Sequence, residues 1–418
     1  MAALQPVRGT KDLIGEDQRR HAYIIATARK ISALYGFEEW QTPIFEDTSV
    51  FARTLGETSD VVTKEMYTFA DRGGDSITLR PEGTAGVARA LVSNGLTQNL
   101  PQKVFYAGPM FRYERPQRGR QRQFHQIGAE LIGADSPLAD AEVIALGRHV
   151  LSKLGVAHKV VLEINTLGDL QSRNEYRAAL VEYFTANRDS LSDDSQMRLD
   201  RNPMRILDSK DPGDKNLVAN APKIDPYLSS SARHFYDSVR RYLELFNISF
   251  RENPRIVRGL DYYSHTAFEF VTDKLGAQGT VLAGGRYDGL VTEMGGPATP
   301  AIGWAAGIER LAELIDAPPT SRIKIAIVPA FESAEAGAIK LLQDLRDSNY
   351  SAEMAYRGNL KRHMERANKI GAVWAVFVPP DPQGDTLFQM KDLQTGEQFE
   401  ISRPGIFEKL KCSFPTNS

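Results

Sequence analysis

The chain has 418 residues, of which 42% are hydrophobic and 25% are charged, and its formal net charge is −2. This balance is typical of a globular protein, and the length predicts two or three domains. The single cysteine, Cys412, excludes a disulfide framework within the chain and a cysteine-based metal cluster. The seven histidines show no metal-ligand spacing such as H-x-x-x-H, the N-terminus lacks a secretion signal, and no apolar run is long enough to span a membrane. We therefore expect a cytoplasmic protein without a membrane span and without a metal ion held by imidazoles.

The first predicted elements are a helix and a short strand. Apolar residues recur at helical spacing from Ile24 to Tyr35, and Gly36 follows as a stop signal. Residues 37–43 then predict a strand that ends on Pro43, because a proline is tolerated only at a strand end or a sheet edge.

A hairpin is predicted further along the chain. Val104–Glu114 and Phe124–Leu131 alternate like strands, and the segment between them, Arg115–Gln123, has no apolar pattern and predicts a long loop. One face of this antiparallel pair bears polar side chains, namely those of Arg112, Glu114, Gln126 and Glu130. Such a face is either exposed to solvent or a binding site.

The central part of the chain changes character twice. Residues 169–224 are polar, with Asp-Pro, Asn-Pro and Pro-Gly dipeptides between helical stretches, and predict an inserted, mainly helical module. Strands are expected again at Arg255–Val271, near Thr280–Leu282 and at Ala301–Ala306, and a helix follows the last of these.

The C-terminal part predicts a separate domain. Pro318-Pro319 marks a linker, and the segments after it alternate strand, helix, strand, helix, strand from Ile323 to residue 378. This order implies a small parallel sheet with covering helices. The second of these helices, residues 360–370, gathers four basic residues, which are Lys361, Arg362, Arg366 and Lys369.

Nucleotide-binding signatures based on glycine are absent from the sequence. There is no G-x-x-x-x-G-K-[ST] loop, and Gly284–Gly289 is not a dinucleotide fingerprint. If ATP is used, side chains must hold its phosphates, and the planar, permanently charged guanidinium suits that task. Five arginines fall between Arg112 and Arg122. A solvated loop is the ordinary alternative, but Arg112 is expected inside a strand, where a free charge is costly, and a loop of arginines can also follow a nucleic-acid backbone.

The same stretch resembles a known motif. Phe111–Gln126, FRYERPQRGRQRQFHQ, resembles motif 2 of class II aminoacyl-tRNA synthetases in the form typical of the histidyl-tRNA synthetase family. Other segments resemble further motifs of the family and occur along the chain in the family's order. They are Pro43 of motif 1, the amino-acid-binding turn Arg80–Thr84, the two histidine-specific motifs Arg258–Tyr263 and Ala283–Gly289, and motif 3 at Gly303–Arg310. The resemblance covers essentially the whole chain.

The resemblance implies a role for individual residues. The catalytic residues are Arg112, Arg258 and Arg310. The ATP-binding residues are Arg112, Glu114, Arg310 and Phe124, whose ring would stack on adenine. The histidine-binding residues are Glu82, Gly83, Thr84, Arg112, Gln126, Glu130, Arg258, Tyr262 and Tyr263, with Glu130 and Tyr263 reaching the imidazole. The tRNA-binding residues are Arg115, Gln117, Arg118 and Arg120.

The resemblance also implies a fold and a reaction. The fold class is α/β: a class II catalytic domain with a mainly antiparallel sheet at residues 1–318, and a small α/β anticodon-binding domain at residues 322–418. The reaction is activation of L-histidine with ATP to histidyl-adenylate and pyrophosphate, followed by transfer to the 3′ end of histidine tRNA. ATP is a substrate, Mg²⁺ is expected with it without an assigned protein ligand, and motif 1 implies a homodimer.

Two alternatives share this fold. The regulatory subunit of ATP phosphoribosyltransferase is a synthetase-like binding protein that generally lacks the anticodon-binding domain. A class II ligase that acts on a free amino acid or a protein lysine would not need that domain either.

Overall fold

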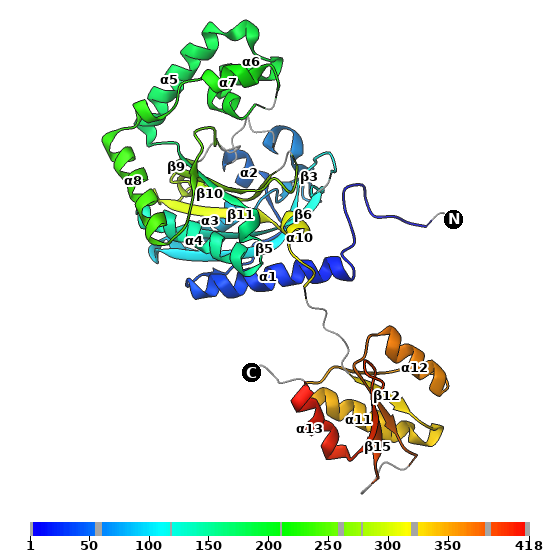
Figure 1. Cartoon of the computed structure of the whole chain (residues 1–418). Coiled ribbons are helices and arrows are strands. Elements are labelled where there is room, and N and C mark those ends of the chain that lie inside the picture. Colours follow the sequence, from blue (N-terminus) through cyan, green and yellow to red (C-terminus); the bar gives the residue numbers. More distant parts are fainter. Residues whose placement is uncertain are drawn as a thin grey trace. The chain divides into compact units, whose positions relative to one another are not determined.

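The computed structural model describes residues 3–54, 61–117, 119–209, 211–257, 263–276, 279–318, 325–380 and 386–413. The chain divides into two compact units, Met1–Pro318 and Pro319–Ser418 (Figure 1). Among the helices of the described ranges, none is long and apolar enough to cross a membrane.

An eight-stranded sheet forms the centre of the first unit, in the order β1-β5-β6-β11-β10-β9-β7-β8. The β1/β5 and β7/β8 pairs are parallel and the other pairs are antiparallel, so the predicted mainly antiparallel sheet is confirmed. Its strands are β1 (Glu38–Glu39), β5 (Gln102–Phe111), β6 (Gln123–Ile132), β7 (Val161–Thr166), β8 (Arg251–Glu252), β9 (Ser264–Val271), β10 (Thr280–Arg286) and β11 (Ala301–Gly307).

One face of this sheet is covered by four helices that share its largest apolar cluster. They are α1 (Glu16–Leu34), α4 (Pro137–Lys153), α8 (Ser230–Leu245) and α10 (Ile308–Leu314). Helix α1 runs along one side of the sheet (Figure 1), and it buries Ile24, Ala28 and Ile31, which recur at helical spacing. Because Gly36 has a positive φ of 78°, the chain can turn there into β1. The predicted strand at 37–43 is much longer than the two residues of β1, which pairs only with β5.

The other side of the unit holds shorter elements around a second apolar cluster. The helices are α2 (Thr48–Thr54), α3 (Thr84–Ser93) and α9 (Leu290–Glu293), and a small sheet in the order β2-β4-β3 consists of β2 (Phe45–Asp47), β3 (Tyr67–Ala70) and β4 (Ser76–Leu79). Along the whole chain, short segments of other helix types complete the elements. They are the π-helical segment η1 (Val61–Glu65) and the 3₁₀ segments η2 (Leu96–Gln98), η3 (Ala157–Lys159), η4 (Arg188–Ser190), η5 (Pro203–Asp208) and η6 (Asp225–Tyr227) of the first unit and η7 (Glu332–Ala334) of the second.

Between β7 and α8 the chain leaves the sheet and forms a helical layer of its own, drawn in green in Figure 1. Its helices are α5 (Leu170–Ala186), α6 (Asp193–Arg201) and α7 (Asp214–Asn220). Leu180, Phe184 and Ile206 are fully buried in a separate apolar cluster of this layer.

The second unit contains a five-stranded sheet in the order β13-β12-β14-β15-β16. Its strands are β12 (Ile325–Pro329), β13 (Ala352–Met354), β14 (Trp374–Val378), β15 (Phe388–Asp392) and β16 (Gln398–Ile401), and its helices are α11 (Glu335–Asp347), α12 (Leu360–Lys369) and α13 (Arg403–Ser413). The first three strands are parallel as predicted, but β15 and β16 add an antiparallel hairpin. The small parallel sheet predicted from this segment is therefore extended by two antiparallel strands that the sequence reasoning missed.

Candidate active site

A cavity of about 850 Å³ lies in the first unit, over the part of the sheet formed by β6, β11 and β10. Residues from the start of α3, the loop after β5, α10 and the helical layer around η5 and α7 complete its wall. Ten residues singled out by the sequence lie on this wall: Glu82, Thr84, Arg112, Glu114, Arg120, Phe124, Gln126, Glu130, Tyr263 and Arg310.

The alternation of β6 separates the cavity from the apolar core. Ile127, Ala129 and Leu131 lie in the core cluster shared with α1 and α4, whereas Gln126 and Glu130 line the cavity. The polar face predicted for the hairpin therefore lines this cavity.

The strands β6, β11 and β10 form the floor of the cavity, and glycines on these strands leave space for its polar groups. Gly303 of β11 pairs with Glu130 of β6, and a Cβ atom at Gly303 would lie 1.6 Å from Glu130 Oε2. A Cβ atom at Gly128 would lie 2.1 Å from the ring of Tyr106. Both positions require glycine because the neighbouring side chain lies across the backbone.

Glu130 is the most deeply buried carboxyl group of the cavity, with 1% of its surface exposed. It accepts hydrogen bonds from Thr84 Oγ1 at 2.7 Å and from the Tyr287 hydroxyl at 2.6 Å. Burial raises the pKa of Glu130 to about 8, although these two donors act in the opposite direction. The ordinary expectation for a glutamate near a strand end, a solvated surface residue, is wrong here.

Glu82 and Gly83 shape the turn before α3. Each Glu82 carboxylate oxygen accepts one backbone N–H, from Thr84 at 2.7 Å and from Ala85 at 2.8 Å. Burial raises the pKa of Glu82 despite these donors. A Cβ atom at Gly83 would lie 2.2 Å from the Tyr106 ring, so this glycine permits close packing and does not itself line the cavity.

Cationic groups form another part of the wall. Arg112 follows directly after β5, one residue outside the strand in which we expected it. Its Nε donates to the Pro81 carbonyl at 2.9 Å, and its guanidinium lies 5.3 Å from the centroid of the Phe124 ring. Arg310 donates to the Thr280 carbonyl, and burial together with the nearby Arg120 lowers the pKa of its guanidinium.

The loop after β5 is divided between the cavity and the surface. Arg120 pairs with Glu114 at 2.9 Å and lines the cavity. Arg115 and Gln117 are exposed and do not line it. Arg118 lies outside the described residues, as do Arg258 and Tyr262 of the first histidine-specific motif.

Two aromatic residues of the site were missed by the sequence reasoning. Tyr287 belongs to the motif Ala283–Gly289, but its contact with Glu130 depends on the strand order and not on spacing. Its neighbour Arg286 is fully buried and forms an ion pair with Asp140 of α4 at 2.5 Å. Tyr106 packs against both Gly83 and Gly128. The alternation of side chains along the strand before Arg112 could have shown which face of the sheet Tyr106 occupies.

The comparisons with known proteins address the whole chain. Residues 9–311 match a family model described as "Histidyl-tRNA synthetase", and residues 324–413 match one described as "Anticodon binding domain". The chain belongs to the histidyl-tRNA synthetase family. It is 66% identical to a histidine–tRNA ligase from Gluconacetobacter diazotrophicus over 97% of this chain and 98% of that protein. It is 61% identical to one from Gluconobacter oxydans over 96% and 97%.

A solved structure gives the same assignment. Apo histidyl-tRNA synthetase from S. aureus superposes with a TM-score of 0.82 and 36% identity, over 98% of this chain and all of that one. Membership of the family therefore rests on both units of the chain, since the two family models match one unit each.

Proposed function

We propose that this chain is a histidine–tRNA ligase. It activates L-histidine with ATP to histidyl-adenylate and pyrophosphate, and then transfers histidine to the 3′ end of histidine tRNA. The observation that carries this proposal is a buried carboxyl group, Glu130, in a cavity whose wall also bears Arg112 and Arg310. The floor suits a small polar side chain and the cationic wall suits phosphates.

The floor is suited to an imidazole ring. A neutral imidazole presents one N–H donor and one acceptor nitrogen, and Glu130 can accept from the donor while Thr84 and Tyr287 hold it in place. A ligand without a ring donor would leave the remaining acceptor capacity of the buried carboxyl group unused, with only Thr84 and Tyr287 as donors. Sites of this kind reject such analogues by roughly 10⁴–10⁵ without an editing domain. We assign Tyr263, which also lines the cavity, to the second ring nitrogen.

The backbone groups of the substrate would lie between the floor and the cationic wall. Gln126 Oε1 is buried and accepts no hydrogen bond in the described structure, so it can accept one from the α-ammonium group. The Glu82 carboxylate holds the turn before α3 and still has lone pairs that face the cavity. We assign Glu82, Gly83, Thr84 and Gln126 to these groups, together with Arg258 and Tyr262.

Catalysis would then depend on position and charge. The substrate carboxylate attacks the α-phosphorus and pyrophosphate leaves, so two anions must approach each other. Arg112 and Arg258 would offset this repulsion from two sides, and Arg310 would hold the γ-phosphate end. Phe124 would stack on adenine, with Glu114 beside it. No nucleophilic side chain is required, because orientation supplies much of the rate.

Mg²⁺ would enter with the ATP phosphates and neutralise part of their charge. The cavity wall bears the carboxylates of Glu114 and Glu269, but Glu114 pairs with Arg120 and Glu269 accepts a hydrogen bond from Thr280, so we assign no protein ligand to this ion.

The remaining assignments concern partners and domains. We assign residues 1–318, with the module at about 169–224, to catalysis and residues 322–418 to the anticodon region of the tRNA. Arg115, Gln117, Arg118 and Arg120 would meet the tRNA near its acceptor end. The compartment we propose is the cytoplasm.

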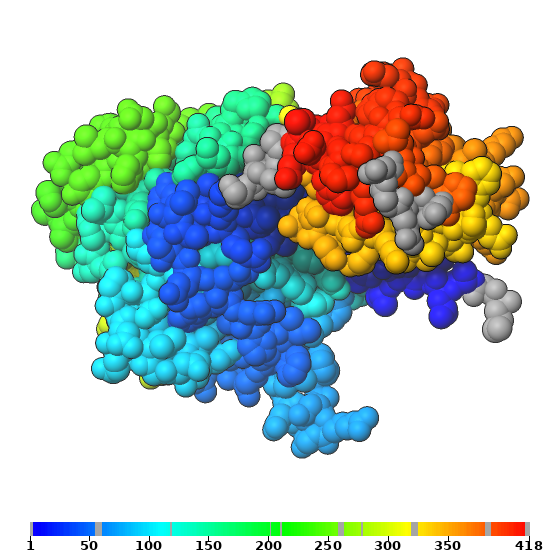
Figure 2. Space-filling view, turned by 90° about the horizontal axis from the view of Figure 1, so that it is seen from below, coloured from blue at the N-terminus to red at the C-terminus, as the bar shows by residue number. Residues whose placement is uncertain are grey.

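A homodimer is proposed through the face that contains motif 1. Blue residues of the N-terminal part lie on the surface of the first unit beside cyan residues (Figure 2). Exposed apolar side chains occur on and next to the small sheet, at Ile44, Phe45 and Phe69. A partner subunit would cover such side chains.

Histidine-dependent exchange of labelled pyrophosphate into ATP tests the proposal directly. Exchange that requires histidine and is followed by charging of histidine tRNA is the expected result. A chain that binds histidine without exchange would be a regulatory paralogue of ATP phosphoribosyltransferase. A chain that exchanges with another amino acid, such as lysine, would be a ligase of different specificity.

A further inference from the structure

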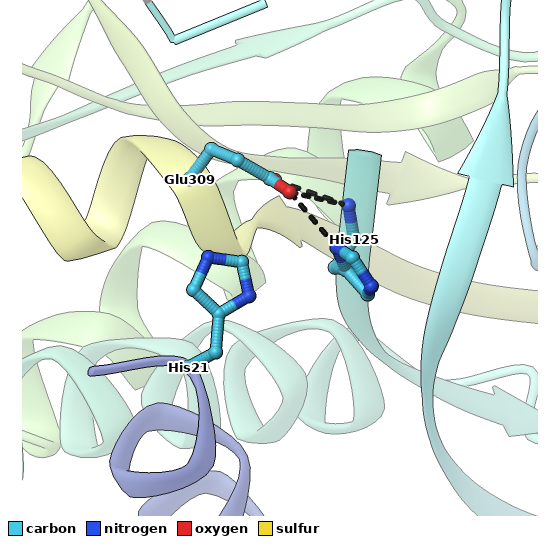
Figure 3. A group of neighbouring side chains, drawn as sticks. All are labelled: His21, His125 and Glu309. Atoms are coloured by element: carbon cyan, nitrogen blue, oxygen red, sulfur yellow. Dashed lines mark hydrogen bonds and ion pairs between the residues drawn. The ribbon is translucent and has the colours of Figure 1, made fainter. Parts of the chain in front are cut away.

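A second cavity, of about 220 Å³, shares Gly119, Gln121 and Glu309 with the wall of the catalytic cavity. On its surface the side chains of His21, His125 and Glu309 point toward one another, from α1, β6 and the first turn of α10 (Figure 3). One ring nitrogen of each histidine and one carboxylate oxygen of the glutamate, the atoms that could bind a metal ion, all lie within 4.8 Å of one another. None of the roles assigned above uses this group.

His21 is the member whose environment needs an explanation. Only 5% of its surface is exposed, and its Nδ1 is buried without a hydrogen-bond partner among the described residues. A buried polar atom without a partner costs free energy, so native proteins nearly always satisfy it.

The other two members already form a preorganised pair. His125 Nδ1 lies 2.9 Å from Glu309 Oε1, and the backbone N–H of His125 donates to the same carboxylate at 3.0 Å. The carboxylate is therefore oriented before any ligand arrives. Such hydrogen bonds to a ligating group are a regular feature of protein metal sites.

The spacing of the two rings agrees with a shared tetrahedral ion. Two imidazoles bound to one Zn²⁺ at about 2.0–2.1 Å would have ring centroids about 5 Å apart. The centroids of His21 and His125 are 5.2 Å apart, with an angle of 88° between the ring planes. The ligand atom of His21 would have to lie about 3.3 Å from those of the other two residues, and His125 Nδ1 and Glu309 Oε1 would move apart from 2.9 Å to a similar distance. Side-chain rotation beside a cavity allows both changes.

Nearby positive charges are engaged elsewhere. Lys11 forms an ion pair with Asp17. Arg20 pairs with Glu16 at 2.7 Å and donates to two backbone carbonyls near the end of α10. The cation would therefore meet two neutral rings and one carboxylate directly, with the Lys11 and Arg20 charges already balanced.

We propose that His21, His125 and Glu309 form a binding site for one zinc ion, with a water molecule from the adjoining cavity in the fourth position. Two imidazoles and one carboxylate with an open position are a ligand set that Zn²⁺ takes in proteins. Mg²⁺ and Ca²⁺ prefer six or more oxygen ligands and do not suit this site.

Zinc at this site would join three parts of the chain that are distant in sequence. His125 and Glu309 are separated by 184 positions, and His21 brings in the N-terminal helix. Occupancy would therefore fix α1 and the first turn of α10, which also bears Arg310, against β6. Because zinc binds the folded chain, it should raise the melting temperature with increasing concentration.

The test uses the full-length chain without an affinity tag and with Cys412→Ser, because Cys412 is an exposed free thiol. The metal-free protein is titrated with Zn²⁺, and bound zinc is measured by mass spectrometry after dialysis. One zinc per chain is expected, with a rise in melting temperature. His21→Gln should weaken zinc binding at least about 100-fold, since even loss of a supporting partner costs 10–100-fold. His149→Gln, a half-buried histidine of α4 outside the group, is the matched control and should bind as the parent does.

Two outcomes would overturn the proposal: no stoichiometric zinc in the parent chain, or equal affinity in the parent and His21→Gln. If His21→Gln does not fold, Co²⁺ replaces the mutagenesis. The parent should then show the intense visible absorption of four-coordinate Co²⁺, and one equivalent of Zn²⁺ should abolish it. A weak, six-coordinate spectrum would also reject the site.

Discussion

The Tyr287 hydroxyl donates to Glu130 at 2.6 Å across an intervening strand. Glu130 lies on β6 and Tyr287 follows β10, and β11 runs between these two strands. The bond passes over Gly303 of β11, which pairs with Glu130 and has no side chain to obstruct it. One glycine thus permits the arrangement on which the proposed histidine specificity depends.

Gly303→Ala should displace Glu130, because the new Cβ atom would lie 1.6 Å from its carboxylate oxygen. We expect loss of histidine-dependent pyrophosphate exchange and a destabilisation of about 1–3 kcal/mol, the usual range for overpacking. Gly289→Ala is the control, since nothing lies within 4 Å of its Cβ position. Normal exchange in Gly303→Ala would mean that the carboxyl position is not critical.

Tyr287→Phe removes the hydroxyl and keeps the ring. A buried acceptor that loses its donor costs about 1–3 kcal/mol, so kcat/KM for histidine should fall about 5–100-fold while the KM for ATP changes little. Steady-state exchange at varied histidine and varied ATP separates the two effects. Tyr176→Phe, which loses a buried hydroxyl bonded to the Pro222 carbonyl in the helical layer, is the matched control. An equal loss for both substrates would contradict a specific role in histidine recognition.

The raised pKa of Glu130 predicts a pH-dependent stability. Below its ordinary pKa of 4.5 the carboxyl is protonated in both states and contributes no pH dependence. Between pH 4.5 and about 8 the unfolded chain loses this proton and the folded chain keeps it. The free energy of unfolding should therefore fall by up to about 1.4 kcal/mol per pH unit over this range and level off above it.

Glu130→Gln isolates this effect, because a glutamine side chain does not titrate. Urea unfolding of both chains at pH 5, 6, 7 and 8 gives the difference in free energy of unfolding at each pH. The difference should shift in favour of Glu130→Gln by several kcal/mol from pH 5 to pH 8. A difference that does not change with pH would place the pKa of Glu130 near its ordinary value.

Elements marked by local sequence patterns could be predicted, whereas contacts between residues distant in the sequence could not. The hairpin β5/β6 was predictable because alternation and a long polar loop are local signals. Arg286 and Tyr287 are sequence neighbours, yet one pairs with Asp140 in the core and the other with Glu130 in the cavity. Strand order decides these partners, and no local pattern encodes strand order.

The residues of the proposed zinc site would show the same limit. The spacing argument against imidazole ligands considered only histidines close in sequence, whereas folding brings together His21 and His125 from α1 and β6. The hairpin β15/β16 was missed for a different reason. Phe388 and Met390 are buried and Gln389 between them is exposed, which is a strand pattern too short to stand out beside the preceding βαβ order.

Substitutions of different arginines in the loop after β5 should affect different steps of the reaction. Arg115 is exposed and outside the cavity, so Arg115→Ala should leave histidine-dependent exchange close to the parent value. If Arg115 contacts one tRNA phosphate, its loss should reduce the slope of log affinity against log salt by about one.

Arg120 lines the cavity and pairs with Glu114, so Arg120→Ala should slow exchange as well as transfer. Exchange and single-turnover transfer, measured at several salt concentrations for both variants, test this division. Loss of exchange in Arg115→Ala would show that the whole loop serves the first step, and normal exchange in Arg120→Ala would assign it to tRNA alone.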